Sequence, residues 1–159
     1  MGTMANIPAQ QIALKFRTGR KTDVRAQFAA LCWRVKNDNV QICLVTSRTR
    51  GRWILPKGWP MHNQTPAAAA AMEAYEEAGL RGDALDICLG VYSYVKPLRH
   101  GNAPIVAMVY PVHVQHVLSE WPEKHQRRRK WFSLEKAARK LDEPGLRHIV
   151  ATFDPARLR

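Results

Sequence analysis

The chain has 159 residues, 25 of them lysine or arginine and 13 aspartate or glutamate, which gives a formal net charge of +12. This length suits one domain with a hydrophobic core, and a hydrophobic content of 46% excludes an intrinsically disordered chain. The charge, with a sequence pI near 10.2, predicts attraction to polyanions such as nucleotides, inositol phosphates, RNA or acidic membrane surfaces, and composition does not choose among them.

The cysteine pattern indicates the compartment. Cys32, Cys43 and Cys88 lie far apart inside apolar, strand-like runs, and an odd number without CxxC spacing favours reduced, buried thiols in a cytoplasmic protein. No apolar run approaches the roughly 18 residues of a membrane span, and the N-terminus lacks an apolar core of the signal type. We therefore expect a soluble protein without a membrane partner.

The first half of the chain combines a basic arm with a β-hairpin. Residues 1–24 are expected to form an irregular N-terminal arm and residues 25–159 a single domain. Strands are predicted over 27–35 and 40–47, because both segments are rich in β-forming residues and the turn-forming segment 36–39 separates them. A basic turn at 48–52 leads into a short apolar strand at 53–55, which Pro56 ends.

A helix follows the loop at 57–64. Thr65 is the expected N-cap, Pro66 takes the first helical position, and Gly79 closes the helix. The alanine run 67–71 favours a helix with small side chains that packs closely on a sheet.

The second half of the chain is predicted to contain two longer strands and two short helices. The strands are expected over about 86–95 and 104–117 with a turn at 99–102, and the helices near 134–141 and 144–152. No internal repeat or domain linker is present. Strands mixed with helices predict an α/β sandwich in which helices cover a mixed sheet.

The predicted helix at 66–78 carries an acidic cluster in a basic protein. Glu73, Glu76 and Glu77 are three and four residues apart, so they share one helical face. Like charges at this spacing weaken a helix, and acids near its C-terminus oppose the helix dipole. A solvated acidic face is one explanation, and a bound cation is the functional one.

Fixed spacings connect this helix to the loop before it. From residue 58 to residue 80 the chain resembles the Nudix box, G-x5-E-x7-R-E-U-x-E-E-x-G-U, where U is a bulky apolar residue. The matching residues are Gly58, Glu73, Glu76, Glu77, Gly79 and Leu80, with Ala74 as a small apolar stand-in. Two positions differ, because Gln64 replaces the first glutamate of the box and Met72 replaces its arginine.

Resemblance to Nudix hydrolases implies a Nudix-type α/β/α sandwich with a mixed sheet and a metal-dependent hydrolase of phosphoanhydride bonds. It implies that Glu76 and Glu77 ligate Mg²⁺ or Mn²⁺, that Glu73 is a third ligand or helps to activate water, and that the Gly58 carbonyl is a further ligand. The chemistry agrees, because Mg²⁺ prefers carboxylate oxygens, neutralises phosphate charge and activates water.

The two departures from the box affect the charged residues that hold the metal-binding carboxylates in place. In the family the box arginine orients one carboxylate, and the first glutamate belongs to the same network. Losing both together avoids a single unpaired charge, so our hypothesis is a compensated variant that retains activity. The alternative is a Nudix-fold module that binds RNA or a regulatory nucleotide without cleaving it.

Further site residues are expected outside the box. A later loop often supplies another acid in this family, and Glu120 and Glu123 are the candidates; we assign Glu120 a catalytic role. Substrate-binding cations are expected at Lys57, Arg48, Arg50, Arg52, Lys96 and Arg129. They belong to a wider basic set that also holds Arg17, Arg20, Lys21, Arg25, Arg99, Arg127, Arg128 and Lys130, any of which is equally consistent with a solvated face.

The runs that flank the box resemble the diphosphoinositol-polyphosphate phosphohydrolase branch, which is also associated with dinucleoside polyphosphates. These runs are 51–58 before the box and 120–132 after it. A competing enzymatic interpretation is a nucleotide pyrophosphatase, for which Trp59 and Tyr94 are candidates to stack on a base. His113 and His116 fall on opposite faces of one strand, which favours packing or surface roles over metal binding. The sequence does not predict an oligomeric state.

Overall fold

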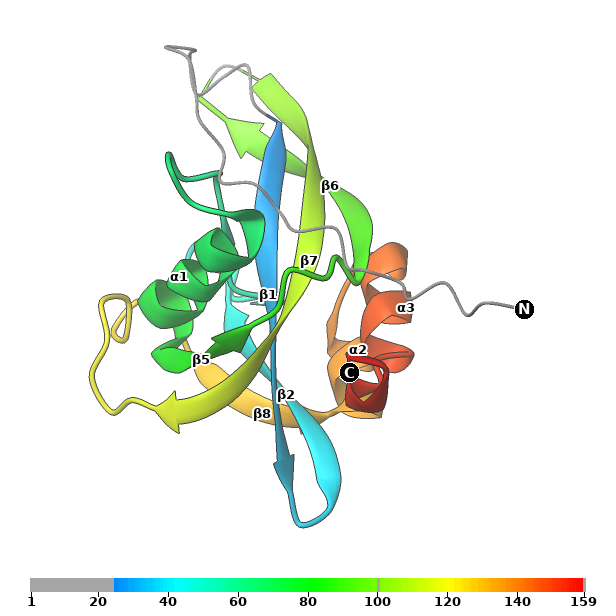
Figure 1. Cartoon of the computed structure of the whole chain (residues 1–159). Helices are drawn as coiled ribbons and strands as arrows, with labels where there is room; N and C mark the ends of the chain where they lie inside the picture. The colour runs from blue at the N-terminus through cyan, green and yellow to red at the C-terminus, as the bar shows by residue number, and fades with distance from the viewer. Residues whose placement is uncertain (1–24, 100, 159) are drawn as a thin grey trace.

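The computed structural model describes residues 25–99 and 101–158 (Figure 1). The predicted arm at 1–24, with Arg17, Arg20 and Lys21, lies outside these residues. The described strands are β1 (Ala26–Lys36), β2 (Asn39–Thr46), β3 (Trp53–Ile54), β4 (Lys57–Gly58), β5 (Leu80–Ala84), β6 (Gly90–Leu98), β7 (Gly101–Val117) and β8 (Arg129–Ser133). The helices are α1 (Pro66–Ala78), α2 (Leu134–Lys140) and α3 (Pro144–Ala151), followed by a 3₁₀ turn, η2 (Pro155–Leu158).

The strands form one mixed sheet, as predicted. Its main path runs β3-β2-β1-β7-β5, while β8 pairs with β2, β4 with β1 and β6 with β7. β1 and β7 are parallel and the other pairs are antiparallel. In Figure 1 α1 covers one face of the sheet, and α2 and α3 cover the other.

Two hydrophobic cores lie on the two faces of β1. Phe28, Ala30 and Cys32 belong to the core under α1. Ala29 and Leu31 belong to the core under α2 and α3. Because successive strand residues point to opposite faces, a strand covered on both sides reads as a continuous apolar run. The β1 segment has this composition, and β1 is the central support of both layers.

Local sequence rules predicted the hairpin and the long helix correctly. Asn37 and Asp38 have φ values of 51° and 62°, which is the conformation that a two-residue hairpin turn requires. Thr65 Oγ1 accepts a hydrogen bond from the backbone N–H of Ala68 at 3.1 Å, and Gly79 closes α1 in the left-handed conformation. The predicted N-cap, start and end of this helix are confirmed.

The sequence patterns did not predict β4, β5 or β8, and they misplaced the starts of β6 and β7, since β7 begins at Gly101 and not at residue 104. β5 contains Gly82 and Asp83, which favour turns, yet it pairs with β7. The pairing with β7 therefore outweighs the low strand propensity of these residues. β6 begins at Gly90 rather than near residue 86. Cys88 therefore lies in the connection before β6 and is exposed, so its predicted burial is wrong, whereas Cys32 and Cys43 are buried as expected.

The histidines of β7 have the roles expected for them. The His113 ring stacks on the Trp33 ring, with centroids 4.0 Å apart and planes at 6°. His116 is exposed. Among the described helices, none combines the length and apolar character that crossing a membrane requires.

Candidate active site

Close packing of α1 brings its acidic face against β4. The buried alanines of the helix lie in the core under α1, and small side chains allow a close approach. Glu73 is buried beside Gly58, where a Cβ atom would lie only 2.0 Å from Glu73 Oε1. No side chain other than hydrogen fits at residue 58 unless Glu73 moves. The glycine therefore provides the space that the carboxylate occupies.

Trp121, in the segment between β7 and β8, and Arg129, at the start of β8, donate to the carbonyl groups at the end of α1. The Trp121 indole N–H donates to the Glu77 carbonyl at 3.2 Å, and Arg129 Nη1 donates to the Ala78 carbonyl at 2.8 Å. Arg129 also donates to the Leu118 carbonyl at 3.0 Å. These donors, one of them cationic, offset the cost of acids near a helix C-terminus.

Glu123 comes to the acidic face through the same segment. Its backbone N–H donates to the Glu76 carbonyl at 3.0 Å, which fixes the loop on the helix. Its side chain accepts from Arg127 Nη2 at 3.3 Å and lies 3.5 Å from Arg48 Nη1. A fourth carboxylate thereby joins the three that α1 carries.

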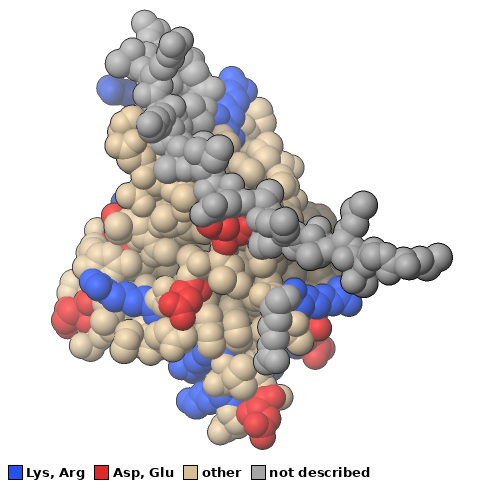
Figure 2. All heavy atoms as spheres, viewed as in Figure 1, with Lys and Arg blue, Asp and Glu red and all other residues tan. Residues whose placement is uncertain are grey.

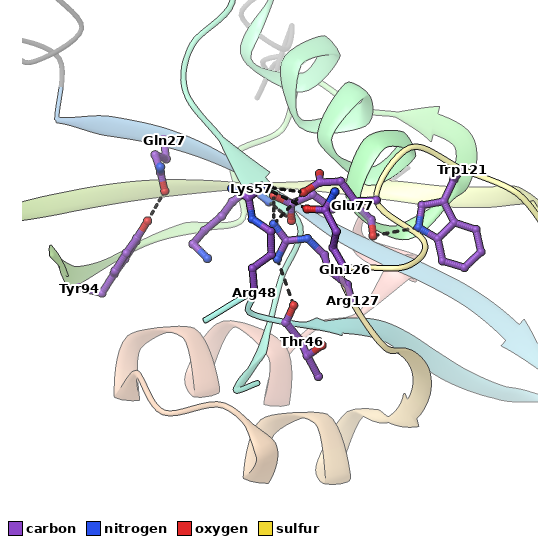
Figure 3. A network of polar contacts seen from close by, with 10 residues as sticks. Gln27, Thr46, Arg48, Lys57, Glu77, Tyr94, Trp121, Gln126 and Arg127 are labelled. Carbon is purple, nitrogen blue, oxygen red and sulfur yellow. Dashed lines mark hydrogen bonds and ion pairs between the residues drawn. The ribbon is translucent and has the colours of Figure 1, made fainter. Parts of the chain in front are cut away.

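A buried arginine, Arg127, pairs with two of these carboxylates, and Figure 3 shows it beside Glu77. Arg127 Nη2 lies 3.2 Å from Glu77 Oε1 in addition to its contact with Glu123. Its Nη1 donates to the Thr46 carbonyl at 3.0 Å. The Arg127 and Glu77 side chains are only 6% and 8% exposed, so water screens their interaction weakly. The backbone N–H of Lys57 donates to the other Glu77 oxygen at 3.3 Å.

Burial and mutual repulsion disfavour the charged forms of the acids. Burial, with the Glu77 and Glu76 charges, raises the pKa of Glu73 to about 7. Burial also raises the pKa of Glu77 to about 7, against the opposing effects of Arg127 and Lys57. Burial is the largest cause of both shifts, so it is the main influence that opposes ionisation of these two acids.

These groups line a cleft of about 650 Å³. It holds most of the site residues predicted from sequence: Arg48, Arg52, Lys57, Gly58, Glu73, Glu76, Glu77 and Lys96. Its lining also includes Glu123, Arg127, Asp142 and Glu143. From sequence, Glu123 is one of two candidate acids and Arg127 is one member of a basic run. Asp142 and Glu143 follow α2 and carry no motif, so no sequence signal identified them.

Three predicted residues do not line this cleft. Glu120 is exposed and pairs with Lys124 at 2.5 Å, because the loop turns it away from the helix before Glu123 returns. Arg129 is occupied at the C-terminus of α1, with its guanidinium 4.0 Å from the centre of the Trp121 ring. Arg50 is exposed in the turn before β3. Arg25 and Arg99, from the wider basic set, are likewise exposed and absent from the lining.

Two lysines of the cleft form cation–π contacts with aromatic rings. Lys96 Nζ lies 4.8 Å from the centre of the Trp59 ring, and Lys57 Nζ lies 5.2 Å from that of Tyr94. The Tyr94 hydroxyl donates to the Gln27 side chain. Burial lowers the pKa of both lysines. The rings thus support cations at positions suited to phosphate groups.

The donor chemistry of the cleft fits a hard divalent cation. Glu73, Glu76 and Glu77 provide carboxylate oxygens, which Mg²⁺ and Mn²⁺ prefer. Among residues 25–99 and 101–158, no three acidic, histidine or cysteine side chains are already gathered around one metal position. The chemical type of the donor atoms therefore suits a divalent cation, but the donors do not form a ready-made coordination sphere.

The two departures from the motif lie at the surface. Met72 is 42% exposed and Gln64 is exposed, and neither lines the cleft. The replacement of both therefore leaves no unpaired charge in the site. A cation near Glu77 is instead supplied by Arg127, from a segment distant in sequence.

Comparisons with known proteins agree with this geometry. The family model described as NUDIX domain matches residues 25–153. Diphosphoinositol polyphosphate phosphohydrolase 3-beta of Homo sapiens is 32% identical over 127 residues, which cover 79% of this chain and 74% of that protein. Nudix hydrolase 16, mitochondrial, of Arabidopsis thaliana is 34% identical over 116 residues, which cover 70% of this chain and 63% of that protein. The crystal structure of C. elegans Ap4A hydrolase superimposes with a TM-score of 0.60 at 18% identity, covering 86% of this chain and 99% of that one, which shows a shared fold.

Proposed function

Because this chain belongs to the Nudix hydrolase family, we propose that it cleaves a phosphoanhydride bond in a small molecule with closely spaced phosphates. The favoured substrates are a diphosphoinositol polyphosphate or a dinucleoside polyphosphate, the classes in the names of the human relative and of the C. elegans structure. The observation that carries the proposal is one cleft that combines the acids of α1 with cations from several other segments.

The chain's own residues have distinct parts in this reaction. Arg48, Lys57 and Lys96 bind phosphate oxygens at the cleft wall. Arg127 keeps Glu77 oriented, and Lys57 holds the second Glu77 oxygen through its backbone N–H.

Glu73, Glu76 and Glu77, with the Gly58 carbonyl, are the groups that would hold Mg²⁺ or Mn²⁺. When bound, the cation supplies charge neutralisation on the phosphate and lowers the pKa of water. Glu123 is the later-loop acid that replaces Glu120 in this assignment, because it lines the cleft beside Arg127.

The test is a substrate panel with the purified protein. Diphosphoinositol, dinucleoside and nucleoside polyphosphates are incubated with Mg²⁺ or Mn²⁺, and released phosphate or nucleoside phosphate is measured. Glu77→Gln should lower the rate about 10²- to 10⁴-fold, as expected for a positioned catalytic group. Glu120→Gln is the matched control, since it removes an equal charge outside the cleft. Failure to turn over any member of the panel would refute the enzymatic proposal.

The departures at Gln64 and Met72 are the observation that favours a second function, a Nudix domain that binds RNA or a regulatory nucleotide without cleaving it. Such a protein would bind members of the same panel and release no product. Retention of all three acids of α1 in one cleft supports hydrolysis over this alternative.

A further inference from the structure

The excess positive charge of this protein is not located in the catalytic cleft. The cleft lining contains five basic side chains, Arg48, Arg52, Lys57, Lys96 and Arg127, against six acidic ones, Glu73, Glu76, Glu77, Glu123, Asp142 and Glu143. On the part of the surface visible in Figure 2, basic and acidic side chains are intermixed. Residues 25–99 and 101–158 contain 20 basic and 12 acidic side chains, so their excess of positive charge lies outside the cleft.

A second cavity of about 670 Å³ concentrates positive charge. It lies where the edge strand β8 meets β2 and α2, and we call it the α2–β8 groove. Its lining consists of Gln41, Lys130, Trp131, Phe132, Ser133, Lys136, Arg139 and Lys140. Four of these eight residues are cations and none is an acid. The groove is as large as the cleft and has the opposite balance of charge.

Lys136, Lys140 and Arg139 of the groove are available to a ligand, while Lys130 Nζ lies 5.4 Å from the centre of the Phe132 ring. In the described part of the chain, neither Lys136 nor Lys140 forms an ion pair. Arg139 pairs with Glu135 at 3.0 Å, but these side chains are 64% and 80% exposed. Exposed pairs of this kind contribute at most about 1 kcal/mol, so a phosphate can displace Glu135 at little cost.

The groove is suited to phosphates and not to stacked bases. The guanidinium of Arg34 lies 3.9 Å from the centre of the Trp131 ring, and Trp131 also packs against the core under α1. The Trp131 ring therefore has a packing role, and Arg34 is a further cation beside the groove. The uncharged polar groups of the lining are the Gln41 amide and the Ser133 hydroxyl.

We propose that the α2–β8 groove binds the phosphate backbone of single-stranded nucleic acid, independently of the hydrolytic cleft. A concave basic groove can follow a single strand, whereas proteins read the major groove of a duplex with a helix or ribbon that enters it. Recognition through phosphates predicts little dependence on base sequence and similar affinity for RNA and DNA.

The salt dependence of binding gives the number of contacts. Each phosphate neutralised on a single strand contributes roughly 0.7 to the slope of log K against log salt. Four cations in the groove predict a slope of about −3. Loss of two of them predicts a slope shallower by about 1.4.

The test uses the full chain and a fluorescein-labelled oligouridylate, with anisotropy measured over a NaCl series. The variant Lys136→Ala/Lys140→Ala should show the shallower slope and weaker binding, while its thermal unfolding midpoint and its hydrolytic rate stay those of the wild type. The control Arg25→Ala/Lys36→Ala removes the same charge from exposed residues outside both cavities. It should bind like the wild type.

Three results would overturn the proposal. The first is absence of binding by the wild-type protein at low salt. The second is an equal loss in the control variant, which would indicate non-specific attraction to the net charge. The third is binding to phosphatidylserine vesicles without binding to the oligouridylate or to an oligodeoxythymidylate, which would assign the groove to a membrane surface.

Discussion

Replacement of Arg127 by methionine tests how the acidic site is held together. Arg127→Met keeps a long side chain in the buried space and removes the guanidinium that pairs with Glu77 and Glu123. Within the described part of the chain, Glu77 would then remain buried with the Lys57 backbone N–H as the one donor left to its carboxylate. Its charged form would lose its main electrostatic partner.

The expected cost is large compared with the stability of a domain. Removal of one partner from a buried ion pair typically costs about 3–5 kcal/mol, and a lost hydrogen bond such as that to the Thr46 carbonyl costs about 1 kcal/mol more. Domains are usually stable by only about 5–15 kcal/mol. Arg127→Met should therefore lower the free energy of unfolding by roughly 5 kcal/mol at pH 8.

The pH dependence distinguishes this mechanism from a simple packing defect. The pKa of Glu77 is already raised to about 7, and Arg127 opposes that rise, so the variant raises it further. The cost then applies where Glu77 is ionised and shrinks as the pH falls through the folded pKa. Urea unfolding at pH 8 and pH 5.5 measures both values.

Arg48→Met is the matched control. Arg48 also contacts Glu123, at 3.5 Å, but its side chain is 61% exposed, so its loss should cost less than about 1 kcal/mol. Equal destabilisation by the two substitutions, or a cost for Arg127→Met that is the same at both pH values, would refute the reasoning.

Three further predictions concern the same cleft. Gly58→Ala should lower kcat about 100-fold, because its Cβ would displace Glu73. Steady-state kinetics measures this change, and a near-normal kcat would contradict the prediction. The metal-free protein should melt at higher temperature at pH 5.5 than at pH 8, because the Glu73 carboxyl, whose pKa rises from 4.5 to about 7, destabilises the fold by roughly 2 kcal/mol more at pH 8; Glu73→Gln should weaken this dependence, and calorimetry checks it. Gln64→Glu with Met72→Arg should change the rate less than about threefold, because both side chains lie outside the cleft; a large gain would indicate an impaired wild-type site.

Much of the local structure follows from the sequence alone. The N-cap Thr65, the closing Gly79 and the turn at Asn37 and Asp38 satisfy rules that involve only neighbouring residues. The spacing of the acids on α1 follows from helical geometry in the same way. These features were predictable because their physical causes act within a few residues.

Tertiary contacts decided which side chains outside the helix reach the cleft. In the segment from Glu120 to Arg129, sequence offers two acids and several arginines with no criterion to choose among them. The bond from the Glu123 backbone to α1 turns this acid inward, and the start of β8 at Arg129 leaves Arg127 free to enter the cleft. Which acid and which arginine of this segment reach the cleft therefore depends on the path of the folded chain.

The sequence by itself therefore determined the helix, its acids, the glycine beside them and the total charge. Only the tertiary structure decided that Arg127 supports Glu77, that the cleft is nearly balanced in charge, and that four cations and no acid line the α2–β8 groove. The reason is that helix periodicity and capping are local, whereas the burial and pairing of a charge depend on segments that only folding brings together.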